Sequence, residues 1–171
     1  MWGYPNLFAD DIDRLEFLRH LGRVSSRDGC TCIAFCLMDN HHHLIVEVDA
    51  GVLSLAMRDL NWAYARAFNG RQGLRGHVQF DRYGARRIID TDDLLGRYAY
   101  VANNPVDAGL CDLAEEWLWS SHGGTIGTRL PSSFVDPTRV LAAFRLSPDP
   151  REALRRYVDL RRKSHDFAAM R

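Results

Sequence analysis

Hydrophobic residues recur along this chain with the spacing of helices in some stretches and of strands in others. A helix over 10–26 is predicted by apolar residues at helical spacing, namely Leu15, Leu18, Leu21 and Val24. Apolar, β-branched runs over 31–38 and 41–48 predict two strands. The turn Asp39-Asn40 separates them, and both residue types tolerate tight turns. We therefore expect an antiparallel hairpin.

The rest of the chain favours helices, with one irregular interval. A helix is predicted over 52–68, closed by Asn69-Gly70, and another over 91–104, where Pro105 disfavours continuation. Short β-like pieces stand at 77–80 and 86–89, and helices are predicted at 136–144 and 150–162. This pattern indicates an α+β fold in which a small antiparallel sheet has helices packed on one face.

The balance of charged residues limits how this chain could bind nucleic acid. The 171 residues carry 22 basic and 22 acidic side chains, so a nucleic-acid partner would need a local basic face. Such a face is indicated between Trp62 and Ile89, where Asp81 is the single acid among six arginines: Arg66, Arg71, Arg75, Arg82, Arg86 and Arg87. Interleaved aromatic residues, Tyr64, Phe68, Phe80 and Tyr83, suit base stacking. A solvated, arginine-rich hairpin explains the same pattern equally well.

No segment indicates export or a membrane. The start lacks a basic flank followed by an apolar region, and no apolar run approaches 18 residues. We therefore expect a cytoplasmic, nucleoid-associated protein with reduced thiols at Cys30, Cys32, Cys36 and Cys111. A zinc site at these cysteines is disfavoured because no Cys-x-x-Cys pair is present.

Three consecutive histidines open the second predicted strand. Because strand side chains alternate, His41 and His43 share one face and His42 takes the other. The first and third imidazoles could converge on one cation, although a hydrogen-bonded pair would produce the same pattern. On the predicted helix 91–104, Tyr100 and Asn104 stand one turn apart on the polar face and could meet at a common point.

Two blocks of sequence resemble a known family. Residues 38–44, Met-Asp-Asn-His-His-His-Leu, resemble the Met-Pro-Asn-His-hydrophobic-His-Leu signature of the HUH single-tyrosine transposases. Residues 100–110, Tyr-Val-Ala-Asn-Asn-Pro-Val-Asp-Ala-Gly-Leu, resemble the tyrosine block of the REP-associated tyrosine transposase branch. Residues 76–83 and the Trp-Ser-Ser of 119–121 agree with that branch, so the resemblance covers 8–156.

The resemblance implies a ferredoxin-like HUH sheet and a specific chemistry. It implies that residues 1–125 form the catalytic domain and that 126–171 form its C-terminal helical extension. His41, His43 and Asn104 would hold Mg²⁺ or Mn²⁺, although imidazoles alone would also suit Zn²⁺. Tyr100 would attack single-stranded or hairpin DNA and form a 5′-phosphotyrosine intermediate, which strand transfer requires. The six arginines would contact the DNA, and a homodimer is compatible with the family.

Three departures from the family pattern bear on this prediction. His42 replaces a hydrophobic residue that is usually buried, and a buried histidine needs partners. Asp39 replaces a proline. The family's first strand, normally beside the histidine strand, is missing, which leaves an unpaired sheet edge. A truncated reading frame, a decayed transposase or a partner chain would each explain this. The rival function is a catalytically inactive DNA-binding relic, and an unrelated metal-binding protein is a third alternative.

Overall fold

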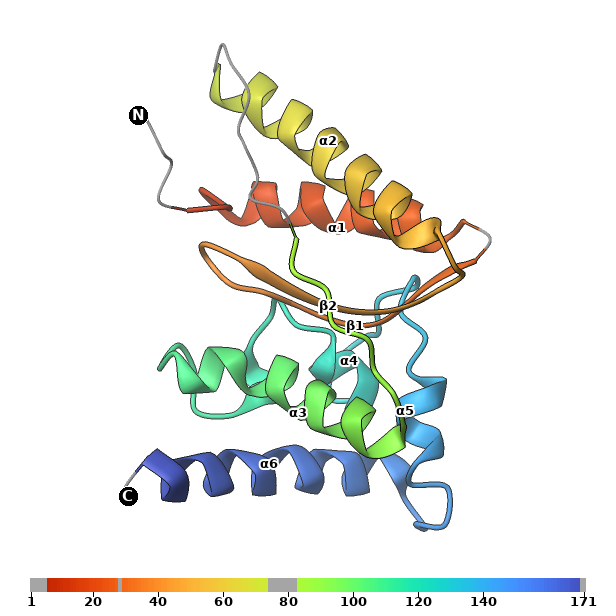
Figure 1. Cartoon of the computed structure of the whole chain (residues 1–171). Coiled ribbons are helices and arrows are strands. Elements are labelled where there is room, and N and C mark those ends of the chain that lie inside the picture. The colour runs from red at the N-terminus through yellow and green to blue at the C-terminus, as the bar shows by residue number, and fades with distance from the viewer. Residues whose placement is uncertain (1–5, 28, 74–82, 170–171) are drawn as a thin grey trace.

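The computed structural model describes residues 6–27, 29–73 and 83–169, in which two strands lie between two layers of helices (Figure 1). The elements in chain order are α1 (Asp11–Ser25), β1 (Cys30–Leu37), β2 (His42–Val48), α2 (Val52–Gln72), α3 (Thr91–Asp107), the 3₁₀ turn η1 (Ala114–Glu116), α4 (His122–Ile126), α5 (Thr138–Ala142) and α6 (Pro150–Ala169).

The strands form the predicted antiparallel hairpin, and its register fixes the direction of the histidines. Leu37 pairs with His42 and Cys36 pairs with His43. Because paired side chains share a face, His43 lies on the face of Cys36 and His42 on the face of Leu37. The other edge of β1 carries single bridges to Ser120 and Val135. Among the described residues β2 pairs with β1 alone.

The first layer, α1 and α2, covers the face of Leu37. The Asp10 carboxylate caps α1 by accepting the N–H groups of Ile12 and Asp13. The core of this layer is aromatic and aliphatic, with Phe17, Leu21, Leu37, Leu60 and Tyr64 almost fully buried. The predicted stripe on α1 was partly wrong, because Leu15 is 58% exposed whereas Phe17 packs inward.

The second layer, α3 with α4, α5 and α6, covers the face of Cys36. Its core joins α3 to α6 through Leu94, Tyr98, Leu154 and Val158. The α+β class is therefore confirmed, and the resolved sheet has helices on both faces rather than on the one face expected. The reason lies in β1, where seven of eight residues are buried, so both faces of the strand need cover.

Several element ends differ from the sequence predictions. Helix α2 continues through Asn69-Gly70 and stops at Gly73, whose positive φ of 65° ends the helix. Helix α3 continues past Pro105, because Ala108 still donates its N–H to the Asn104 carbonyl. Residues 86–89 form no strand, and the β-like piece at 77–80 lies outside the described residues.

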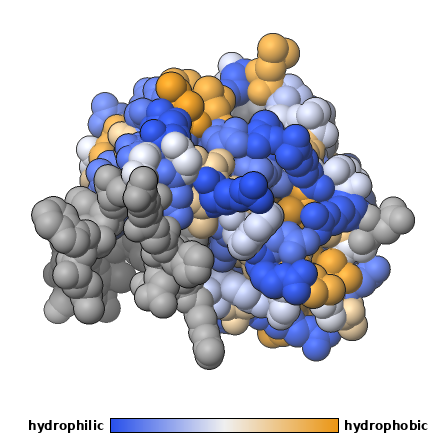
Figure 2. Space-filling model, turned by 90° about the horizontal axis from the view of Figure 1, so that it is seen from above, coloured by the Kyte–Doolittle hydropathy of each residue, from blue (hydrophilic) through white to orange (hydrophobic). Residues whose placement is uncertain are grey.

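The surface over α1 and α2 differs from the interior, where three of the cysteines lie. The face over α1 and α2 is mainly hydrophilic with scattered apolar side chains (Figure 2). None of the described helices is long and apolar enough to cross a bilayer. Cys30, Cys32 and Cys36 are free and buried as predicted, and burial raises the pKa of Cys32 and of Cys36 to about 12.

Candidate metal and tyrosine site

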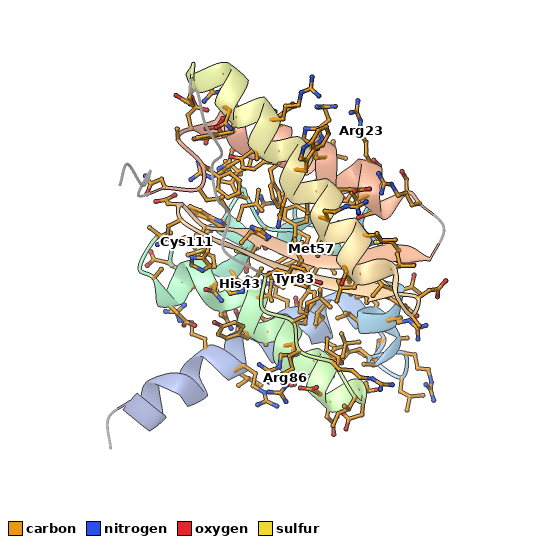
Figure 3. The ribbon with its side chains drawn as sticks, turned by 45° about the horizontal axis from the view of Figure 1, so that its top comes forward. Arg23, His43, Met57, Tyr83, Arg86 and Cys111 are labelled. Atoms are coloured by element: carbon orange, nitrogen blue, oxygen red, sulfur yellow. The ribbon has the colours of Figure 1, made fainter. Side chains whose placement is uncertain are left out.

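His41 and His43 project from the start of β2 toward α3. Their Nε2 atoms are 3.1 Å apart and their rings meet edge to face, with centroids separated by 4.8 Å. His43 is partly buried whereas His41 is exposed, so the pair lies at the rim of the second layer. Figure 3 shows His43 between the hairpin and α3. The pairing predicted from strand alternation is therefore present.

Helix α3 supplies the facing side chains. The Oδ1 atom of Asn104 lies 3.2 Å from Nε2 of His43. The Tyr100 ring stands edge to face against the His43 ring at 5.4 Å between centroids, and Tyr100 is 46% exposed. Tyr98, two residues earlier, is 1% exposed and belongs to the core. The structure thus brings His41, His43, Asn104 and Tyr100 to one place, and the 3.6-residue helical period separates the two tyrosines.

Hydrogen bonds to neighbouring groups orient two of the donor atoms. Nδ1 of His41 lies 2.7 Å from Oδ1 of Asn40, and because an amide oxygen only accepts, this hydrogen bond requires the tautomer with the proton on Nδ1. In that tautomer the Nε2 atom that faces His43 carries the lone pair. Asn104 donates its amide N–H to the Tyr100 carbonyl at 3.1 Å, which turns its Oδ1 toward His43.

The three donor atoms fit a divalent cation. Two ligands about 2.1 Å from a metal and at right angles to each other lie about 3 Å apart, whereas tetrahedral ligands lie about 3.4 Å apart. The 3.1 Å between the two imidazole nitrogens is nearer to the octahedral value, and the 3.2 Å between His43 and Asn104 lies midway between the two values. No group of three His, Cys, Asp or Glu able to hold a metal occurs among the described residues, and the third oxygen or nitrogen atom beside the two imidazoles is the amide Oδ1 of Asn104.

Burial keeps one of the imidazoles neutral. It lowers the pKa of His43, with a smaller effect from the neighbouring His41 and an opposing one from the hydrogen bond to Asn104. A neutral imidazole retains the lone pair that metal binding needs. The site is therefore suited to a cation at neutral pH.

His42 is the residue that departs from the family pattern, and it faces α1. Its ring centroid lies 4.7 Å from that of Phe17, and its buried Nδ1 has no hydrogen-bond partner among the described groups. Burial lowers the pKa of His42 to about 4, so the ring is neutral and packs as an apolar group. It lies on the opposite face of the sheet from His41 and His43, as expected.

The arginines expected to contact DNA occupy different surroundings. Arg66 is exposed on α2, with its guanidinium 5.5 Å from the Trp62 ring. Arg71 pairs with Asp10 at 2.7 Å and with Asp13 at 2.9 Å. Arg86 lies beside α3 and reaches Asp93 at 3.6 Å (Figure 3), and the adjacent Arg87 is exposed.

Of the other residues of 62–89 that were expected to contact DNA, some lie in the core and some lie outside the described residues. Tyr64 and Phe68 are 1% and 2% exposed, so the expectation that they face a base was wrong. Their positions match the inward stripe of α2, and the Tyr64 hydroxyl donates to the Leu7 carbonyl. Arg75, Arg82 and Phe80 lie outside the described residues.

Sequence reasoning missed two supporting residues. Asn40 holds Nδ1 of His41, and its position directly before the histidines was the available signal. Arg14 of α1 pairs with Asp39 in the turn that leads to His41. A charge pair across 25 residues has no periodic signature, so only the substitution of Asp39 for proline pointed to it.

Comparisons with known proteins identify the family and the fold of the chain. The family described as "Transposase IS200 like" matches residues 5–103, which is more than half of the chain. A solved structure of a REP-associated tyrosine transposase bound to a REP hairpin shares the fold, with a TM-score of 0.55 at 21% identity over 72% of this chain and 73% of that one. No curated protein sequence matches. The chain therefore belongs to the IS200-like transposase family.

Proposed function

We propose that this protein is a metal-dependent, single-strand DNA endonuclease and strand transferase that acts through Tyr100. One observation carries the proposal: α3 places Tyr100 against His43, and one turn later it places Asn104 against the same imidazole. A half-exposed tyrosine beside three convergent donor atoms is suited to attack on a phosphate that the same site orients.

His41, His43 and Asn104 would hold the cation, for which we propose Mg²⁺ or Mn²⁺, since two imidazoles and one amide oxygen leave positions open for phosphate oxygens and water. The cation, when bound, would polarise the scissile phosphate and neutralise the charge that develops on it. Asn40 would keep Nδ1 of His41 protonated so that Nε2 stays a ligand. Asn104, by its bond to the Tyr100 carbonyl, ties the ligand to the helical turn that carries the nucleophile.

The reaction exchanges one phosphodiester bond for another, so the number of these bonds does not change. The Tyr100 oxygen forms a bond to phosphorus after losing its proton, and the bond from phosphorus to the 3′-oxygen breaks. The 3′-oxygen of the upstream fragment takes up a proton and leaves as a hydroxyl, while the downstream fragment stays bound to the tyrosine through its 5′-phosphate. Attack by another 3′-hydroxyl then reverses these steps and joins new ends, which is strand transfer.

The proposed DNA substrate is single-stranded or hairpin DNA. The solved relative in fold carries a REP hairpin, and the exposed Arg66 and Arg87 offer cations to a phosphate backbone. Arg71, Arg75, Arg82 and Arg86 complete the proposed contact set. The Arg71 guanidinium already serves two carboxylates, so its contribution to DNA binding should be smaller than that of Arg66.

The test is trapping of a covalent protein–DNA adduct. A hairpin oligonucleotide with a single-stranded flank, 3′-labelled, is incubated with the protein and Mn²⁺, and the label is followed on a denaturing gel. Because the tyrosine holds the 5′ end of the downstream fragment, the 3′ label should migrate with the protein. Tyr100→Phe should abolish the band, whereas Tyr98→Phe, which alters a buried core ring, is the matched control. DNA binding without an adduct would identify the protein as an inactive DNA-binding relic.

A further inference from the structure

We infer that Asp39, held by Arg14, is a positioning residue that sets the ring orientation and tautomer of His41. The inference rests on the proposed function, because it concerns the same ligand set. The new element is a link between this ligand set and α1, which lies on the opposite face of the sheet. The turn Asp39-Asn40 is the physical connection between the two.

Arg14 is an unusual cation for a helix surface because its side chain is only 10% exposed. Its guanidinium carbon lies 5.8 Å from the centre of the Phe8 ring and 5.5 Å from that of Trp119. Two aromatic faces therefore fix where the charge can lie. One guanidinium nitrogen pairs with Asp11, another pairs with Asp39, and the buried Nε has no partner among the described groups.

The two carboxylates that pair with Arg14 come from different elements of the fold. Asp11 belongs to α1 itself, three residues earlier, and its side chain is 72% exposed. Asp39 comes from the tip of the hairpin, 25 residues away in sequence. A buried guanidinium needs a compensating charge, so the pairing with Asp39 draws the hairpin tip onto α1.

The tip is connected to His41 by a short series of hydrogen bonds. Phe8 donates its N–H to the Asp39 carbonyl at 3.1 Å, and Met38 donates its N–H to the His41 carbonyl at 2.9 Å. Asn40 stands between them and accepts from Nδ1 of His41 at 2.7 Å. Because Asp39, Asn40 and His41 are all exposed, packing does little to hold the turn, and the Arg14 pair is the side-chain contact that ties Asp39 to α1.

The chain offers a matched pair of variants. Asp39→Asn and Asp11→Asn each remove one carboxylate from Arg14, but only the first releases the turn. Loss of stability through Arg14 should therefore be similar in both, and loss of His41 orientation should appear only in Asp39→Asn. Thermal unfolding of each variant verifies that both remain folded.

The first readout needs neither metal nor activity. Long-range ¹H–¹⁵N spectra of the imidazole nitrogens, recorded above the titration range of histidine, report the tautomer of His41. The wild type and Asp11→Asn should show the Nδ1-protonated form, and Asp39→Asn should show a mixture of tautomers. An unchanged His41 tautomer in Asp39→Asn would overturn the inference, whatever the protein does to DNA.

The second readout is Mn²⁺ affinity by calorimetry. Loss of a group that orients a ligand weakens metal binding by about 10-fold or more, so Asp39→Asn should show that loss. Asp11→Asn should stay within about 2-fold of the wild type, as expected for an exposed carboxylate. Equal weakening in the two variants would contradict positioning through the turn. If the wild type forms no DNA adduct, the proposed activity fails while both readouts still decide the role of Asp39.

Discussion

Asn104 donates its side-chain amide to the backbone carbonyl of Tyr100, one turn earlier on α3, at 3.1 Å. This bond leaves a single atom, Oδ1, to face His43 at 3.2 Å. The proposed metal ligand and the proposed nucleophile are therefore joined through one helical turn. Any shift of α3 relative to β2 would move both together.

Removal of that oxygen should weaken metal binding. We expect Asn104→Ala to lower the Mn²⁺ affinity by at least about 10-fold, because one of three protein donors is lost. Asn104→Asp keeps an oxygen at the same place and should bind Mn²⁺ at least as tightly as the wild type. Calorimetric titration measures both, and wild-type affinity in Asn104→Ala would remove Asn104 from the ligand set.

Replacement of His42 should stabilise the fold. His42→Leu removes a buried Nδ1 that has no hydrogen-bond partner among the described groups and restores an apolar side chain against Phe17. We expect the free energy of unfolding at neutral pH to rise by about 1 kcal/mol. Urea denaturation measures the change. A less stable His42→Leu variant would show that the imidazole makes a favourable contact that the structure does not contain.

The same substitution should also change the dependence of stability on pH. Burial lowers the pKa of His42 from 6.5 to about 4 in the folded state, so between these values the unfolded chain binds more protons. The free energy of unfolding is therefore unaffected by His42 above pH 6.5 and falls as the pH is lowered toward 4. Between pH 7 and 5 the loss due to His42 should be about 2 kcal/mol. His42→Leu should flatten that slope. Val46→Leu, on the same face of β2, adds apolar volume without changing a titratable group and should keep the wild-type slope.

Two arginines of the predicted DNA face should behave in opposite ways. Arg71 pairs with Asp13, which is 2% exposed, so Arg71→Ala leaves a buried carboxylate without its cation. We expect the free energy of unfolding to fall, because among the described groups the buried carboxylate then keeps only its hydrogen bond from the Ala9 N–H. Arg58→Ala on the same helix breaks an exposed pair with Asp59 and should cost less than about 1 kcal/mol. Equal losses in urea denaturation would contradict the assignment of Arg71 to the fold.

Arg87, in contrast, should affect DNA binding and not stability. It is exposed, and loss of one phosphate contact lowers the slope of log affinity against log salt by about 1. Arg87→Ala should therefore weaken binding of a single-stranded oligonucleotide with a reduced salt slope and an unchanged unfolding free energy. Fluorescence anisotropy over a salt series measures it. An unchanged slope would exclude Arg87 from the phosphate-contacting surface.

Local pattern was enough to predict the hairpin, the helix of Tyr100 and the opposite faces of His41 and His42. These features depend on the short sequence repeats of regular elements, because side chains alternate along a strand and recur about every 3.6 residues along a helix. The end of α2 could not be predicted, because Asn69-Gly70 is compatible with both a helix and its cap, and Gly73 lies four residues on. The helical layer on the second face of the sheet was also missed, since a continuous apolar strand does not reveal which elements will cover it.

For the candidate site too, some residues could be predicted from local sequence patterns and others could not. Motif and spacing brought His41, His43, Tyr100 and Asn104 together, because His43, Tyr100 and Asn104 lie on regular elements and His41 directly precedes β2. Tyr64 and Phe68 were misassigned to a base-stacking surface on composition, whereas their helical spacing with Met57 and Leu60 correctly indicates the buried face of α2. Arg14 and Asp39 were not paired, because contact between distant residues depends on tertiary packing that no local pattern contains.

The central claim is that Tyr100 carries the DNA, and peptide mapping of the trapped adduct tests it most directly. Trypsin should release the peptide 98–129, which contains both Tyr98 and Tyr100. Fragmentation after nuclease trimming should place a phosphonucleotide on Tyr100 and leave Tyr98 unmodified. A phosphonucleotide on any other residue, or full adduct yield in Tyr100→Phe, would contradict the account.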